Sequence, residues 1–232
     1  MSAGCRQQGR LPIFYQGSML APAKNADCCP GDRSISTLDP TSHVFREDLL
    51  MPRIEPISRE QADPQAQQVW DDQIASHGRM TNMKRTLARS GPALAAYMQW
   101  YPLRQEIAPF LGERLTNLFA HAISTQTDCL ICGTFFRRIL IDAGENPDEL
   151  KLDDREQLVV EFGRQIAKDA WGVSEPLFAR LQSYFNDDEI LKLTAFAGLM
   201  VATNIINTLH VELDDYLAAY RSKESHQHGS GT

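Results

Sequence analysis

Apolar residues recur every three or four positions through most of the chain after residue 50, which is the spacing of amphipathic helices. The clearest buried face belongs to a predicted helix over about 112–124 and consists of Leu115, Leu118, Phe119, Ala122 and Ile123. No stretch of useful length alternates apolar and polar residues as a strand does, and no repeat of fixed period occurs. The pattern therefore predicts an all-α fold, a single-domain multi-helix bundle over residues 51–221.

Capping residues indicate where these helices begin and end. The start signals are side chains that accept hydrogen bonds from a first helical turn: Asp63, Asp128, Asp153 or Asp154, Ser174 and Asn186. The stop signals are Gly78, Pro102 and Gly144. Pro64 directly after Asp63, with Gly78 fourteen residues later, is typical of one complete helix.

The segment after Asn186, ILKLTAFAGLMVATNIINTL, is apolar on nearly every side of a helix. Such a helix has to be covered on all sides, so we expect it at the centre of the bundle or in a subunit interface. No stretch approaches the roughly 18 uninterrupted apolar residues that a membrane span requires, so we expect no membrane association.

The two ends of the chain differ from this region. Residues 1–50 contain four Pro, four Gly and equal numbers of acidic and basic residues, without amphipathic period, and are predicted to be a disordered extension. A second interpretation is an over-long assigned start, with Met51 as the true beginning. Residues 222–232 are predicted to be a flexible tail, in which His226 and His228 are solvated and bind no metal.

Charge and motifs exclude several classes of function. The net charge of −7 argues against a nucleic-acid surface, which needs clustered Lys and Arg. No Gly-rich nucleotide loop occurs, so no cofactor is expected. A weak signal-peptide pattern in the extension is interrupted by Gln16, Gly17 and Ser18, and the expected location is therefore cytoplasmic.

Cysteine offers the clearest candidate chemistry. Three of the five cysteines lie in the extension, and the predicted domain keeps Cys129 and Cys132 directly after the expected N-cap Asp128. The N–H groups and dipole of a helix start stabilise a thiolate, and the three-residue offset allows a disulfide. A zinc site would need two further ligands, which the sequence does not place nearby. Inert buried cysteines are the other alternative to a redox-active dithiol.

The segments ERLTNLFAHAISTQTDCLICGTFFRRILIDAGENPDEL, REQLVVEFGRQIAKDA and ILKLTAFAGLMVATNIINTL resemble the carboxymuconolactone decarboxylase and AhpD-like alkylhydroperoxidase superfamily. The resemblance covers about 51–221. It implies an AhpD-like helical fold that assembles as a homo-oligomer, a trimer or hexamer. In the peroxidase branch it also implies a catalytic dithiol, with Cys132 attacking the hydroperoxide and Cys129 resolving the sulfenic acid. The helix dipole alone would favour Cys129.

The sequence departs from the peroxidase branch where that branch has a proton relay of Glu and His. Those positions here are Asn117, Ile131 and Phe136, and none of them can act as a base. General-base assistance typically contributes ~10²–10⁴ in rate, so the usual mechanism should be slow unless another group serves. His121 is the candidate stand-in, although a histidine packed near a helix end is the alternative; two weaker candidates are Glu113 and Arg137.

Three functions follow as hypotheses. The first is a thiol-dependent, peroxiredoxin-type peroxidase that acts on a hydroperoxide or other small molecule and is reduced by an external thiol or a protein. The second is a catalytically degenerate oligomeric scaffold or binding protein. The third is a lactone decarboxylase-type lyase, which the resemblance supports poorly because that branch uses a histidine where Phe136 stands.

Overall fold

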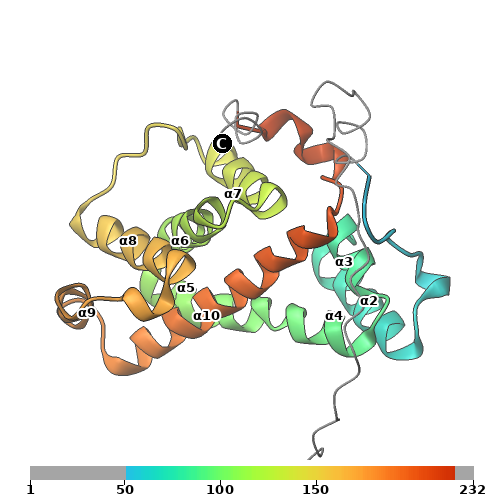
Figure 1. Ribbon diagram of the computed structural model, residues 1–232, viewed down its shortest axis with the longest axis horizontal. Helices are drawn as coiled ribbons and strands as arrows, with labels where there is room; N and C mark the ends of the chain where they lie inside the picture. The colour runs from blue at the N-terminus through green and yellow to red at the C-terminus, as the bar shows by residue number, and fades with distance from the viewer. Residues whose placement is uncertain (1–50, 223–232) are drawn as a thin grey trace, which may run out of the picture. The chain divides into compact units, whose positions relative to one another are not determined.

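The computed structural model describes residues 51–222, and the chain is all-helical throughout this part, with no strand (Figure 1). The predicted fold class is confirmed. Three predictions concern residues outside this part of the chain or its first residue and are not tested. They are the disordered extension 1–50, the alternative start at Met51, and the solvated tail histidines His226 and His228.

The structure contains long helices joined by short connections and 3-10 turns. The α-helices are α2 (Pro64–His77), α3 (Asn82–Leu87), α4 (Gly91–Met98), α5 (Trp100–Leu111), α6 (Glu113–Gln126), α7 (Leu130–Asp142), α8 (Asp154–Lys168), α9 (Glu175–Gln182) and α10 (Asp187–Ile205). The 3-10 helices are η1 (Arg59–Gln61), η2 (Ala170–Gly172), η3 (Ile206–Leu209) and η4 (Asp215–Tyr220).

Most of the predicted start signals are confirmed as N-caps. Side-chain oxygens of Asp63, Asp153, Ser174 and Asn186 each accept a backbone N–H from the first turn that follows. Asp63 also joins two helices, because its second oxygen accepts the N–H of Gly91 at 2.8 Å where α4 begins. The caps therefore fix both helix boundaries and the packing of α4 against α2.

Helix α6 lies at the centre of the bundle and packs against α5, α7, α8 and α10 (Figure 1). Its Phe119 is fully buried and stacks against Phe162 and Phe196, with ring centroids 6.4 and 6.0 Å apart. The predicted apolar face of this helix is thus the face that forms the core. The same helix carries Asn117 and His121, so the core also fixes two candidate site residues in place.

Helix α10 is the apolar helix for which burial on all sides was expected. It packs against α5, α6, α8 and α9, and its Leu193 and Phe196 are fully buried. Its other side is open in the single chain, with Leu191 66% and Ile205 58% exposed. Of the described residues, 187–209 form the one segment long and apolar enough to cross a membrane, a test that core helices of soluble proteins also pass. A subunit interface on the open side remains a prediction.

Two predicted boundaries are wrong. Pro102 does not end a helix: the break lies at Gln99, and Pro102 is in the first turn of α5, where its missing N–H needs no partner. Asp128 is not the N-cap of α7, because it adopts a left-handed conformation with φ of 51° and passes the N-cap position to Cys129. Aspartate tolerates this conformation better than most residues.

The contact between α6 and α8 requires a glycine. A Cβ built on Gly163 would lie 2.8 Å from two ring carbons of Phe119. We expect Gly163→Ala to destabilise the fold by about 1–3 kcal/mol, because overpacking outweighs the gain in helix propensity. Urea unfolding measures this.

Gly198→Ala is the matched control for that variant, since nothing lies within 4 Å of its added Cβ in α10. Its stability should stay the same or rise by up to about 1 kcal/mol. Equal unfolding midpoints for the two variants would contradict the proposed close contact.

Candidate functional site

A largely apolar cavity of about 650 Å³ lies among α2, α3, α4, α5, α6, α7, α10 and the segment around η4. Cys132 lines it. So do Asn117, Ile131 and Phe136, the three positions at which the sequence lacks a relay base. The structure thus places these four residues around one partly open cavity, which is of the size typical of small-molecule sites.

The cysteine pair stands at the start of α7. Cys129 is the N-cap and Cys132 lies in the first turn, and the two side chains are 4% and 7% exposed. Both are thiols, and the Cys132 thiol donates a hydrogen bond to the Cys129 sulfur. The three-residue offset at the helix start thus brings the two sulfurs close to each other, which is the arrangement that a redox-active pair requires.

The two thiols differ in acidity. The hydrogen bond from Cys132 lowers the pKa of Cys129, and the nearby N–H groups of Ile131 and Cys132 add to this effect against the opposing effect of burial. The same hydrogen bond and the burial of Cys132 raise its pKa well above the usual range. Cys129 is therefore the more acidic sulfur, as the helix start predicts, whereas Cys132 is the sulfur that lines the cavity.

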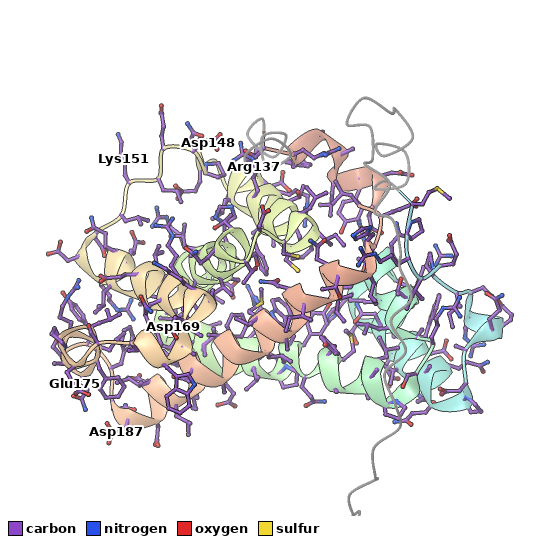
Figure 2. The ribbon with its side chains drawn as sticks, in the orientation of Figure 1. Arg137, Asp148, Lys151, Asp169, Glu175 and Asp187 are labelled. Atoms are coloured by element: carbon purple, nitrogen blue, oxygen red, sulfur yellow. The ribbon has the colours of Figure 1, made fainter. Side chains whose placement is uncertain are left out.

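His121, the predicted stand-in base, does not line this cavity. Burial, together with the positive charges of Arg137 and Arg164, lowers the pKa of His121 to about 4. Arg137 itself, near the middle of α7, pairs at 2.6 Å with Asp148 from the connection that follows this helix (Figure 2). The structure thus groups His121 with Arg137 rather than with the residues that surround Cys132.

This position of His121 predicts acid sensitivity. In the folded chain His121 stays neutral down to about pH 4, whereas in the unfolded chain it is protonated below about 6.5. The unfolded state binds more protons in this window, so stability is lost as the pH falls through it. His121→Gln should recover on the order of 2 kcal/mol at about pH 4.5 and little at neutral pH, as measured by urea unfolding. A difference that is the same at both pH values would contradict this prediction.

The other weaker candidate, Glu113, does line the cavity, but it forms an ion pair with Arg104 from α5. The cavity wall near Cys132 consists otherwise of apolar side chains from α7, namely Ile131, Phe135, Phe136 and Ile139.

Other helices contribute polar residues to the cavity lining that the sequence did not reveal. Lys84 of α3 is 7% exposed, and its ammonium group donates to the Tyr101 hydroxyl of α5 at 2.7 Å. Burial lowers the pKa of Lys84 to about 8. Burial also raises the pKa of the Tyr101 hydroxyl and of the Asp214 carboxyl. In the sequence Lys84 is an ordinary charge in a short polar helix, and no local signal distinguishes it from a solvated one.

The sequence matches no protein-family model and no curated protein. Solved structures are similar in fold. The alkylhydroperoxidase AhpD core of an uncharacterized peroxidase-related protein from Ralstonia eutropha has a TM-score of 0.58 and 16% identity, over 72% of this chain and 94% of that one. An uncharacterized peroxidase-related protein from Silicibacter has a TM-score of 0.52 and 19% identity, over 72% and 93%.

The debrominase Bmp8 is similar as well, with a TM-score of 0.60 and 16% identity over 72% of this chain and 95% of that one. A cysteine-to-alanine variant of Bmp8 in complex with 2,3,4-tribromopyrrole gives the same TM-score and identity. At these identities the likeness shows the fold alone. The chain has the fold of the AhpD core, and proteins of that fold include both peroxidase-related proteins and a debrominase.

Proposed function

We propose that this protein is a thiol-dependent peroxidase in which Cys129 and Cys132 cycle between dithiol and disulfide and reduce an organic hydroperoxide. The observation that carries the proposal is the hydrogen-bonded pair of sulfurs at the start of α7, with Cys132 lining the cavity. The likeness to peroxidase-related proteins supports the same reaction class.

In the first step the Cys132 sulfur attacks the terminal oxygen of the hydroperoxide. The S–O bond forms, the O–O bond breaks, and the alkoxide leaves and takes a proton from water to give the alcohol. The proton of the Cys132 thiol passes along its hydrogen bond to the Cys129 thiolate. Cys129 thus takes the place of the base that Asn117 and Phe136 cannot supply.

In the second step Cys129 resolves the sulfenic acid. Its sulfur attacks the Cys132 sulfur, the S–S bond forms, and the hydroxyl leaves as water with the Cys129 proton. An external thiol or a protein dithiol then returns the pair to the reduced state. We expect this cycle in the cytoplasm, where thiols are kept reduced, and in a homo-oligomer, a trimer or hexamer.

The alternative is a binding protein or scaffold that has kept the fold and lost the chemistry. The apolar surroundings of Cys132 and the absence of a base at Asn117, Ile131 and Phe136 favour it. In such a protein the thiols would ionise near or above the ordinary value of about 8.5, and mild oxidation would not join them. The absorbance of thiolate against pH separates the two functions.

The test of the proposed function uses the full chain with Cys5, Cys28 and Cys29 replaced by serine, so that only the domain thiols are counted. The reduced protein is mixed with cumene hydroperoxide without air. We expect two thiols to be lost for each hydroperoxide consumed, with an intramolecular disulfide as the product. Retention of both thiols while hydroperoxide persists would refute the proposal. Because a debrominase shares the fold, a brominated pyrrole is the second substrate to assay.

A further inference from the structure

Lys84 is a buried cation without a carboxylate partner. None of the ion pairs of the described residues includes it. The Asp214 carboxylate acts on it only at longer range, while the positive charge of Arg79 opposes it. Buried charges in folded proteins are normally paired, so this cation, which lines the cavity, is a group to which an anion would bind.

Other cations also line the cavity. The guanidinium of Arg79 has no ion pair in the described part of the chain and lies 4.3 Å over the ring of Tyr216. Arg138 lies 5.7 Å over the same ring, and its Nε is buried without a hydrogen-bond partner, although its Nη1 pairs with Asp142. Among the described residues that line the cavity, Asp214 is the one carboxylate that forms no ion pair. The cations Lys84, Arg79 and Arg138 therefore outnumber it.

The Tyr101 hydroxyl adds a donor beside Lys84. Its oxygen accepts hydrogen bonds from the Lys84 ammonium at 2.7 Å and from the Gln73 amide at 3.3 Å. A tyrosine hydroxyl has two acceptor sites and one hydrogen, so both acceptor sites are occupied and the hydrogen is free to point to a ligand. An ammonium and a hydroxyl next to each other are a suitable pair of donors for the two oxygens of a carboxylate.

Much of the remaining cavity lining is apolar and aromatic, beside polar residues such as Asn117 and Thr203. Trp100 lies 6.1 Å from Phe136, between centroids, and both line the cavity together with Phe135, Ile139 and Met200. Small-molecule sites typically combine such walls with a few polar groups that fix orientation. The body of the ligand should therefore be apolar and flat, and its charge should lie at the end near Lys84.

We propose that the cavity binds an organic carboxylate with an apolar ring system, the carboxylate at Lys84, Tyr101 and Arg79 and the rings against Trp100 and Phe136. Binding of this anion depends on the cavity alone. That the anion is also the class of compound delivered to Cys132 rests on the proposed function.

The test measures binding without turnover. The full chain with Cys132→Ser is titrated by calorimetry with 2-naphthoate and with 2-naphthamide, which has the same shape and no charge. We expect naphthoate to bind at least about tenfold more tightly, because charge-assisted hydrogen bonds are about twice as strong as neutral ones. Equal affinity for the two probes, or no binding of either, would overturn the proposal.

Variants assign the effect to the cation. Lys84→Met, added to Cys132→Ser, should remove the preference for naphthoate, weakening the binding of naphthoate much more than that of naphthamide. Tyr101→Phe should weaken naphthoate binding to a smaller extent. Lys192→Met is the control, since Lys192 is a surface lysine paired with Glu106. An unchanged preference in Lys84→Met would overturn the proposal, and because no variant turns over, these outcomes are independent of peroxidase activity.

Discussion

Replacing Cys132 with serine should abolish the protein-dependent consumption of hydroperoxide. Only the uncatalysed loss of hydroperoxide, as measured without protein, should remain. Cys132 is the sulfur that lines the cavity, and a serine hydroxyl is too weak an acid to supply an equivalent nucleophile. The measurement is the initial rate of cumene hydroperoxide loss in the background with serine at positions 5, 28 and 29.

Cys129→Ser is the matched variant, and its expected behaviour is different. It should still consume one hydroperoxide per chain and then stop, because Cys132 becomes a sulfenic acid that has no partner thiol. Trapping with dimedone and mass spectrometry detects that species. Its single turnover should also be slower, by on the order of 10²-fold, since the Cys129 thiolate that accepts the proton is gone. Identical rates in the two variants and the parent protein would exclude the dithiol mechanism.

Replacing Phe136 with histidine should increase the rate of hydroperoxide reduction by at least about 10²-fold. Position 136 lies one turn after Cys132 on the same face of α7 and lines the cavity. An imidazole there would stay neutral in apolar surroundings and could accept the Cys132 proton directly. A cost in stability of about 1–3 kcal/mol is expected, because the buried ring gains polar atoms.

Phe136→Leu is the control for this gain, because it loosens the contact with Trp100 without adding a base. Its rate should match that of the parent protein. If Leu and His accelerate the reaction equally, the slow step is entry into the cavity and not proton transfer.

Helix boundaries followed from local chemistry, which is why the sequence predicts most of them. An N-cap such as Asn186 or Asp153 satisfies N–H groups only three residues away, so its effect does not depend on the fold. The boundaries predicted from Pro102 and Asp128 were wrong because each residue type is compatible with two local structures. Proline is compatible with a first turn as well as with a helix end, and aspartate with a left-handed turn as well as with a cap.

The candidate site was predictable only where it is local. Cys129 and Cys132 lie in one helical turn, so their spacing alone indicates paired thiols. Lys84 meets Tyr101 across 17 positions, and the N–H of Asn82 meets Asp214 across 132. Such contacts arise from the packing of α3 against distant segments, and no pattern along the chain contains them. The position of His121 depends in the same way on where α8 and the end of α7 pack.

The burial of both sulfurs has a kinetic consequence. Cys129 is buried, and Cys132 is buried and lines the cavity, so in the proposed cycle we expect oxidant and reductant to use the same entrance in alternate half-reactions. We therefore expect ping-pong kinetics, with parallel lines in double-reciprocal plots. Each substrate in excess should inhibit by occupying the enzyme form meant for the other. A bulky protein donor would also exchange electrons more slowly than a small thiol, because the disulfide offers no exposed sulfur on the outer surface.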